Sequence, residues 1–363
     1  MTQTLDTRVL NRTLLARQGL LERSVRTARD VIEDLVGLQA QEPIDPYVAL
    51  WTRVVDFDPT ELSGLLESRA AVRMGLLRGT LHLVTARDAL ALYPIVADVM
   101  ARSWRSSPFA KRLDGVDIDA VLRAARAAVE ERPMTPSDLG LALAPGWSDR
   151  DPTSLANAAR FLLPLVQVPP RGLWGRTGRP MNTTAEAWLG RPMDRTPSID
   201  DLVRRYLRAF GPASVADMRV WSWLTGLRLV VERLRPGLRT FRDEAGRELF
   251  DVPDAPIATG EERAPIRFLP QYDNVFLSHA DRSRILHPTI SIADMTWRGG
   301  VLIDGFVGAA WRIVRRRGDA TLTVTRYATL DGQQRAAIEE EAERLLAFLA
   351  PDAKTRAIAI ADA

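Results

Sequence analysis

Residues 71 to 85 read AVRMGLLRGTLHLVT, and this stretch decides how the surrounding chain folds. Apolar and β-branched residues fill both halves and Gly79 lies between them, so the stretch predicts a strand, a tight turn and a second strand. The preceding segments 8–20, 26–38 and 59–69 place apolar residues at i, i+3, i+4 and i+7, which is typical of amphipathic helices. Helices followed by a two-stranded ribbon outline a winged helix-turn-helix, a module common on duplex DNA.

The same outline recurs twice along the chain. Residues 117–165 predict three helices, followed by a ribbon at 165–176 that turns at Pro169 to Gly172. Residues 198–237 predict three more helices, and residues 240–252 predict another hairpin. Three tandem units of helices plus a wing indicate a repeat architecture without sequence identity.

The C-terminal part has a different texture. Residues 305–327 alternate on both sides of Arg317-Gly318-Asp319, which predicts a long hairpin, and residues 331–349 predict a closing helix. The fold class expected is therefore α+β. Its predicted parts are winged-helix units at 1–110, 111–195 and 196–254, with a mixed α/β domain at 255–363.

Composition excludes several classes of protein. The 363 residues include no cysteine, and the three histidines lack paired ligand spacing, so we expect no disulfide, no metal site and no cofactor. No apolar run is long enough for a membrane span and the N-terminus lacks a signal peptide, so we expect a cytoplasmic protein.

Net charge is only +3, but residues 171–239 hold 13 arginines against 6 acidic residues. This excess fits either a polyanion partner or a solvated basic surface.

Residues 36–47, VGLQAQEPIDPY, contain the most specific candidate for chemistry. Side chains two residues apart diverge on a helix but share a face in extended backbone. Pro43 disfavours helical backbone at Glu42, so we expect extended backbone at Gln39-Ala40-Gln41, with both amides projecting the same way. The alternative is a polar helix end whose side chains are simply solvated.

Five segments together resemble the AlkZ-type winged-helix DNA glycosylases, the bacterial family that includes the azinomycin self-resistance enzyme. They are GLQAQEPIDPYVALWTR, RGTLHLVTARD, RFLLPLVQVPPRGLWG, LPQYDNVFLSHADRSRI and GFVGAAWRI. The resemblance implies a concave DNA cradle and catalysis by a Gln-apolar-Gln motif, which Gln39, Ala40 and Gln41 match. A related subgroup carries Asp at the second polar place, so Gln41 puts this chain nearer the antibiotic-resistance branch.

What the resemblance implies is monofunctional hydrolysis of the N-glycosidic bond of N7-alkylated purines, including bulky adducts and interstrand crosslinks. Alkylation at N7 makes guanine a cationic, good leaving group, so no strong general acid is needed. A glutamine carbonyl can accept a hydrogen bond from the attacking water and face the positive charge that develops on the sugar. We therefore expect Gln39 and Gln41 to be catalytic.

Several other residues are predicted to contact DNA. Thr80 and His82 match a family segment on the first ribbon, although a lone strand histidine is more often structural. Asp273 and Asn274 belong to a dense polar cluster that fits bracing and DNA contact equally. The arginines expected on DNA are Arg171 and Arg176 on the second ribbon, and Arg315, Arg316 and Arg317 at the long hairpin's tip, which is suited to a minor groove.

The expected partner is double-stranded DNA carrying alkylated purines, bound by a monomer in the cytoplasm at the nucleoid. The main rival is a non-catalytic multi-winged-helix DNA-binding protein or transcription regulator. A third possibility is hydrolysis of another nucleoside or nucleotide, which no GxxxxGK phosphate loop supports. The first two differ at the glutamines, because a regulator tolerates their loss and a glycosylase does not.

Overall fold

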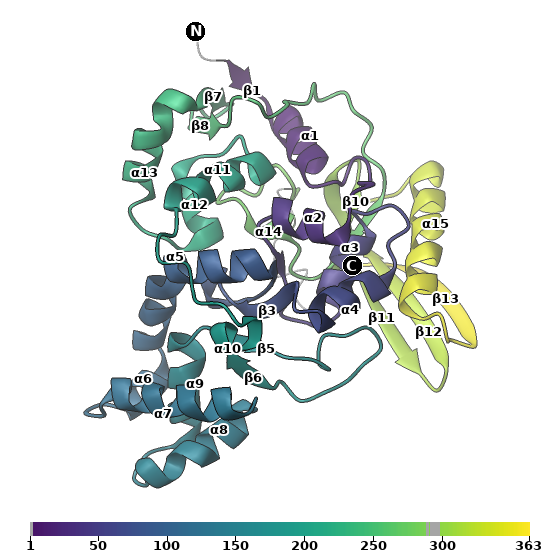
Figure 1. The fold of residues 1–363 in the computed structure, drawn as a ribbon. Helices are drawn as coiled ribbons and strands as arrows, with labels where there is room; N and C mark the ends of the chain where they lie inside the picture. Colours follow the sequence, from purple (N-terminus) through teal and green to yellow (C-terminus); the bar gives the residue numbers. More distant parts are fainter. Residues whose placement is uncertain (1–2, 288–289, 291–297) are drawn as a thin grey trace.

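Three β-sheets with helices packed around them form this computed structural model, which describes residues 3–287, 290 and 298–363 (Figure 1). Helices and strands alternate along the whole described chain, so the predicted α+β class is confirmed. The strands gather into one central sheet, one C-terminal sheet and one small sheet near the N-terminus.

The central sheet contains the stretch from 71 to 85. Its strand order is β2 (Leu38–Gln39), β4 (Leu81–Thr85), β3 (Ala71–Gly75), β5 (Leu165–Gln167) and β6 (Asn182–Thr184), and every neighbouring pair is antiparallel. β3 pairs with β4 from Ala71 opposite Thr85 to Gly75 opposite Leu81, which confirms the predicted strand–turn–strand. The turn η1 (Leu77–Gly79) holds both Arg78 and Gly79 at positive φ, +57° and +69°, which bends the chain sharply.

Helices of the N-terminal segment pack beside strands β2, β3 and β4 of this sheet. They are α1 (Thr7–Arg17), α2 (Ala28–Asp34), α3 (Asp45–Trp51), α4 (Pro59–Glu67) and α5 (Ala86–Arg105). Asp58 is the N-cap of α4, because its side chain accepts a hydrogen bond from the Thr60 backbone N–H. Helices α3 and α5 were not predicted as separate elements.

A group of helices projects at the lower left of Figure 1. It contains α6 (Pro108–Arg112), α7 (Ile118–Glu131), α8 (Pro136–Leu143), η2 (Ala144–Gly146) and α9 (Pro152–Leu162), while α10 (Ala185–Leu189) follows β6. The predicted ribbon turning at Pro169 to Gly172 is wrong. The chain does turn there, but β5 pairs with β6 beyond a loop at 168–181, and β5 also joins β3.

The third helical segment ends in a small sheet. Its elements are α11 (Ile199–Phe210), α12 (Val215–Ser222), α13 (Leu227–Leu234), η3 (Arg235–Gly237), β7 (Arg239–Asp243) and β8 (Glu248–Asp251). β7 and β8 form the hairpin expected at 240–252. The N-terminal strand β1 (Thr4–Leu5) adds to β7 in parallel, so the start of the chain joins the sheet of the third helical segment.

The C-terminal sheet carries the longest hairpin. Its order is β13 (Thr355–Asp362), β12 (Asp319–Arg326), β11 (Phe306–Arg316), β10 (Gly299–Ile303) and β9 (Arg267–Leu269), with α14 (Asn274–Leu277) after β9 and α15 (Gly332–Leu349) before β13. β11 and β12 pair over eight residues on each side, which confirms the predicted long hairpin. The predicted closing helix is α15.

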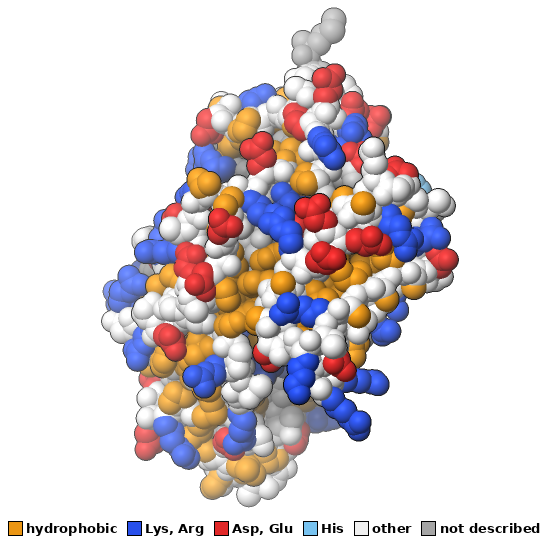
Figure 2. All heavy atoms as spheres, turned by 90° about the vertical axis from the view of Figure 1, so that its right-hand side faces the viewer, with side chains coloured by type: hydrophobic (Ala, Val, Ile, Leu, Met, Phe, Trp, Pro, Cys, Tyr) orange, Lys and Arg blue, Asp and Glu red, His pale blue; other side chains and the backbone are white. Residues whose placement is uncertain are grey.

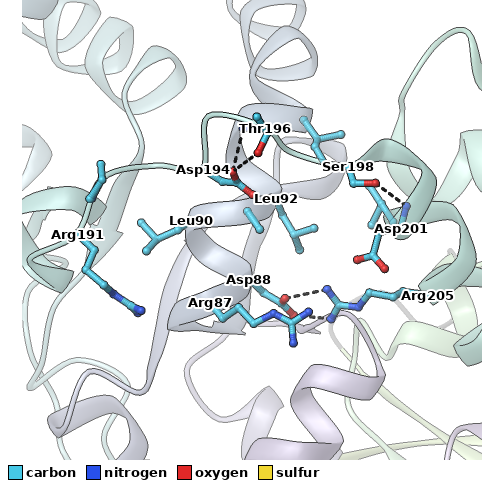
Figure 3. Close-up of a pocket in the computed structure, with 14 residues that line it drawn as sticks. Arg87, Asp88, Leu90, Leu92, Arg191, Asp194, Thr196, Ser198, Asp201 and Arg205 are labelled. Carbon is cyan, nitrogen blue, oxygen red and sulfur yellow. Dashed lines mark hydrogen bonds and ion pairs between the residues drawn. The ribbon is translucent and has the colours of Figure 1, made fainter.

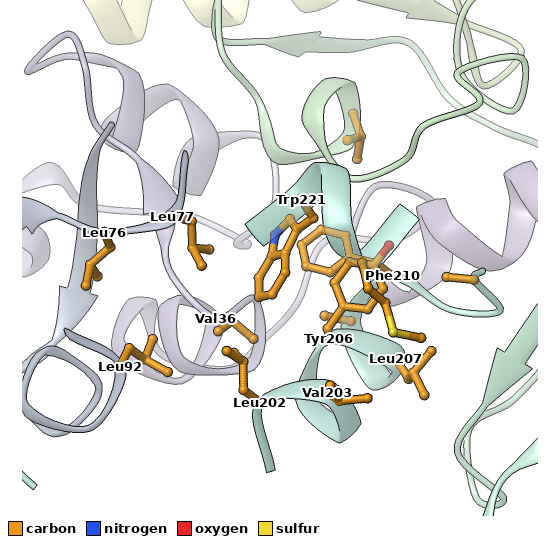
Figure 4. Close-up of a cluster of buried hydrophobic side chains, with 14 of the residues drawn as sticks. Val36, Leu76, Leu77, Leu92, Leu202, Val203, Tyr206, Leu207, Phe210 and Trp221 are labelled. Atoms are coloured by element: carbon orange, nitrogen blue, oxygen red, sulfur yellow. The ribbon is translucent and has the colours of Figure 1, made fainter. Parts of the chain in front are cut away.

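One buried cluster joins the segments that are distant in sequence. Figure 4 shows Val36, Leu76 and Leu77 beside Tyr206 and Trp221 of the third helical segment. The rings of Tyr206 and Trp221 have their centroids 4.8 Å apart. The segment from α11 to α12 therefore packs directly behind the strand–turn–strand at 71 to 85 and fixes its position.

Candidate active site

The Gln39-Ala40-Gln41 segment lies at the edge of the central sheet, where β2 ends. Gly37 turns the chain out of α2 at φ +93°, and a Cβ there would lie 2.6 Å from Val84 Cγ1, so only glycine fits. β2 then covers Leu38 and Gln39, which confirms extended backbone at the start of the motif. Because Leu38 and Ala40 pack into the same apolar cluster, strand alternation turns Gln39 to the opposite face.

Hydrogen bonds from three directions hold the backbone of this segment. Asn274 Nδ2 donates to Gly37 O at 2.8 Å. The Ala40 N–H donates to Leu81 O at 2.8 Å, and Arg73 Nη2 donates to Ala40 O at 2.8 Å. The peptide groups on both sides of Ala40 are therefore fixed, and with them the starting directions of the two glutamine side chains.

Arg78 orients the amide of Gln39. The Gln39 side chain is only 7% exposed, and its Oε1 accepts a hydrogen bond from Arg78 Nη2 at 2.8 Å. Arg78 also donates to the backbone carbonyl of Trp221, so the third helical segment holds its guanidinium in place. Burial lowers the pKa of Arg78 to about 10, which leaves it cationic at neutral pH.

His82 faces Gln39 across the β2–β4 pair and is neutral. Its Nδ1 lies 2.9 Å from Thr80 O, and because a carbonyl only accepts, Nδ1 carries the proton and Nε2 accepts a long contact from Arg78 Nη2 at 3.5 Å. Burial, and secondarily the charge of Arg78, lowers the pKa of His82 to about 3. His82 is 2% exposed, so its side chain lies inside the protein here, and its predicted contact with DNA stays a prediction. The half-buried Thr80 hydroxyl donates to Leu77 O.

Gln41 is exposed and lies at a hollow of about 320 Å³, which we call the Gln41 hollow. This hollow opens between the ends of the central strands and helices α5, α8 and α9. Its lining includes Gln41, Met100, Met134, Leu139, Phe161 and Gln167. The two glutamines of the motif thus differ in environment: Gln39 is buried against Arg78, and Gln41 borders open space.

Besides Arg78, two further buried charged residues next to the motif were not predicted. Arg73 on β3 is 2% exposed, and besides Ala40 O it donates to Gln167 Oε1 at 3.0 Å. Asp45, 6% exposed, begins α3, and its Oδ2 has no hydrogen-bond partner among the described residues. Burial, and then the charge of Glu42, raises the pKa of Asp45 to about 7. Sequence alone gave no signal for either, since a charged residue on a strand or at a helix start is usually solvated.

Asp273 and Asn274 brace the motif from inside the protein. Asp273 is 2% exposed and forms a two-pronged ion pair with the buried Arg53, with N···O distances of 2.6 and 2.8 Å. Asn274 is 9% exposed and holds Gly37 O. Of the two alternatives for this cluster, the buried contacts fit bracing, and the direct contact with DNA stays a prediction.

The predicted DNA-contacting arginines differ in how free they are. Arg171 is half-buried, with Nη1 at 3.3 Å from Gly178 O, whereas Arg176 is exposed. Arg315 pairs with Asp352 at 2.5 Å. Arg316 and Arg317 are exposed, and no side-chain ion pair engages either of them within the described residues. Figure 2 looks onto the side that carries the C-terminal sheet, where Lys and Arg side chains project at the lower right.

A second hollow lies away from the motif. It measures about 480 Å³ and is lined from α5, the 191–198 loop and α11 (Figure 3). Its main polar feature is the pair between Asp88 and Arg205, whose two N···O distances are 2.8 and 2.6 Å. Arg205 also donates to Glu33 O, so this pair ties α5, α11 and α2 together. None of the predicted catalytic or DNA-contacting residues lines this hollow, and we assign it no chemistry.

The described residues show neither a membrane-spanning helix nor a metal cluster. No helix among residues 3–287, 290 and 298–363 has both the length and the apolar character to cross a bilayer. In the same part of the chain, no group of three or more His, Asp or Glu side chains is arranged to hold a metal ion.

Comparison with known proteins identifies the class of protein. The fold matches a solved structure of the Streptomyces sahachiroi DNA glycosylase AlkZ with a TM-score of 0.71 and 21% sequence identity, covering 99% of this chain and 100% of that one. The family model described as DNA glycosylase AlkZ-like matches residues 32–348. No curated protein matches the sequence.

The chain belongs to the AlkZ-like DNA glycosylase family, and it is a DNA glycosylase. The suspected resemblance is thereby confirmed. The matched range includes the Gln39-Ala40-Gln41 segment, Arg73, Arg78 and the β11–β12 hairpin.

Proposed function

We propose that this protein is a monofunctional DNA glycosylase that hydrolyses the N-glycosidic bond of N7-alkylated purines, including bulky adducts and interstrand crosslinks. The observation that carries the proposal is the Gln39-Ala40-Gln41 segment, whose backbone is fixed on both sides of Ala40 and whose side chains are neutral amides. Membership of a DNA glycosylase family supports an enzyme over a DNA-binding protein without catalysis.

The chemistry suits groups that carry no charge. A purine alkylated at N7 is already cationic, so the bond to the sugar breaks without protonation of the base by the enzyme. The neutral state of His82 agrees with this requirement, since its pKa of about 3 makes it useless as a general acid at neutral pH. A weak catalyst also discriminates, because unmodified purines are poor leaving groups.

Gln39 and Gln41 share two tasks in this mechanism. One is to hold the attacking water, and the other is to turn a carbonyl dipole toward the oxocarbenium-like sugar. Arg78 Nη2 occupies one lone pair of Gln39 Oε1 and leaves the second for the water. Asp45, Arg73 and Asn274 act on the backbone around the motif and are positioning residues.

DNA is proposed to bind across the lower part of the molecule as seen in Figure 1. In that view helices α7 and α8 lie on the left and the β11–β12 hairpin lies on the right. We propose that the helical segments at 1–110, 111–195 and 196–254 act as three winged-helix units that form a concave cradle with the domain at 255–363. Arg176, Arg316 and Arg317 are its proposed phosphate or minor-groove contacts, since they are exposed.

An open cradle suits crosslinked lesions. A purine tethered to the opposite strand cannot swing freely out of the helix, as the targets of many glycosylases do, so the catalytic amides have to reach it within the duplex. A single chain that surrounds the duplex in this way acts as a monomer. Its proposed roles are DNA repair at the nucleoid in the cytoplasm and self-resistance to a DNA-alkylating antibiotic.

Base release tests the proposal directly. The purified protein is incubated with a duplex carrying one N7-methylguanine and with a duplex joined by an N7-alkyl interstrand crosslink. We expect free alkylated base, strands that break only after heating in alkali, and separation of the crosslinked strands on a denaturing gel. Absence of base release above the uncatalysed rate on both substrates contradicts the proposal.

A further inference from the structure

The Gln41 hollow is a formed cavity at the rim of the candidate active site. Met100 of α5, Leu139 of α8 and Ala156 of α9 enclose it, and all three are less than 5% exposed. Gly75 and Gly79 line the sheet side without side chains. A Cβ on Gly75 would lie 3.3 Å from Met100 Cε, so the glycine leaves space that another residue would take.

The lining of the hollow selects a kind of ligand. Met100, Met134, Leu139 and Phe161 supply apolar and polarisable surface, which adapts to aromatic rings. The lining contains no aspartate or glutamate, and Arg160 is its one charged residue. A cation therefore has no counter-charge here, whereas a neutral apolar or aromatic group is buried against carbon and sulfur atoms.

We propose that the Gln41 hollow receives the apolar or aromatic substituent carried on N7 of the damaged purine. This inference rests on the proposed function. In a purine, N7 and N9 flank the same ring carbon, C8, so a group attached to N7 leaves the base next to the glycosidic bond at N9. With Gln41 working at that bond, the substituent enters the cavity that Gln41 borders.

The volume of the hollow limits the size of the N7 substituent that it can hold. At about 320 Å³ it lies at the low end of small-ligand sites, which span roughly 300–1,000 Å³. It holds a group the size of one or two rings and leaves a methyl group without contacts. The enzyme consequently prefers purines whose N7 carries a compact apolar group over N7-methylguanine.

Paired substrates test this preference. Duplexes carrying N7-benzylguanine or N7-methylguanine are compared by kcat/KM, each normalised to its uncatalysed release rate. We expect the wild-type enzyme to favour the benzyl substrate about tenfold, as a hydrophobic contact of this size does. The substitution Ala156→Leu fills the hollow and lowers the benzyl value about tenfold, while the methyl value stays within about twofold. Thr153→Leu, on the exposed side of α9, is the matched control and changes neither.

Each outcome decides the proposal. Equal loss on both substrates overturns it, because the hollow then receives the purine itself or supports the catalytic segment. No change on either substrate overturns it too. If Ala156→Leu does not fold, Arg160→Ala at the exposed rim replaces it and has to change the benzyl-to-methyl ratio. Base release from neither substrate by the wild-type enzyme is a different result, since it contradicts the proposed function and not the assignment of the hollow alone.

Discussion

The Gln39-Ala40-Gln41 segment and the tip of the β11–β12 hairpin are built in opposite ways. The first is tied by hydrogen bonds to β3, β4 and α14, with Gln39 and Ala40 buried. The second projects Arg316 and Arg317 into solvent, and among the residues that the structure describes the one ion pair of these arginines is at Arg315. Hydrolysis needs groups held in one geometry, whereas contact with phosphates tolerates long flexible side chains. Substitutions in the two regions are therefore expected to separate catalysis from DNA affinity.

Single substitutions of the motif glutamines have the largest expected effect. Gln39→Ala and Gln41→Ala each lower the rate of base release by about 100- to 1,000-fold, since each removes a polar group aimed at the reacting centre. Their DNA affinity stays within about twofold of the wild type. Gln333→Ala, on the exposed surface of α15, is the matched control. Equal losses of rate and affinity would contradict the expected separation of catalysis from DNA binding.

The buried Asp45 next to the motif is expected to make the stability of the fold depend on pH. Because burial raises the pKa of Asp45 to about 7, the folded protein keeps a proton there that the unfolded chain releases above about 4. The free energy of unfolding therefore falls as pH rises from about 4 to about 7, by about 3 kcal/mol in total. Asp45→Asn removes this fall in urea unfolding, and Asp149→Asn, an exposed control, does not. Identical pH profiles for wild type and Asp45→Asn refute the assignment.

Arg78 is expected to act through Gln39. Arg78→Met removes the donor to Gln39 Oε1 and lowers the single-turnover rate about tenfold, because the amide loses its orientation. KM and DNA affinity remain nearly unchanged, and Arg78→Lys restores part of the rate. A purely structural role for Arg78 predicts instead lower thermal stability with an unchanged rate in the folded fraction.

The hairpin tip has the smallest expected effect on catalysis. Arg316→Ala/Arg317→Ala reduces the slope of log K against log salt by about 1 to 2, which corresponds to the loss of two phosphate contacts. The rate of base release at saturating enzyme stays within about twofold. Arg228→Ala, on α13 at the upper left of Figure 1, leaves the slope unchanged. An unchanged slope for the hairpin variant would show that the tip does not contact DNA.

The sequence predicted local elements well and non-local contacts poorly. The hairpin at 71–85 and the long hairpin at 305–327 are confirmed, because turn residues and alternation within each are sufficient. The ribbon at 165–176 was wrong, since the partner of β5 lies beyond a long loop. Arg73, Arg78 and Asp45 were missed for a related reason. Arg73 lies against Gly172 and Arg78 bonds to the Trp221 carbonyl, both distant in sequence, and no periodicity in the sequence records such contacts or the burial of Asp45.

The same difference between local and non-local signals explains which features of the site could be predicted. Extended backbone at the motif followed from Pro43, which is a local signal. Whether a polar side chain faces DNA or the protein interior is not local. Asp273 and Asn274 looked the same in sequence as a solvated loop, yet Arg53 and Gly37 O take their hydrogen bonds inside the protein. His82 was buried by the packing of three strands and the Arg78 turn.

The central claim is that two fixed neutral amides perform the hydrolysis. Its most direct test is single-turnover base release by Gln39→Ala/Gln41→Ala on an N7-methylguanine duplex, with binding followed in the same samples. We predict that the double variant binds the duplex as tightly as the wild type and releases base no faster than free DNA does. Release by the double variant at a rate near that of the wild type would contradict the account.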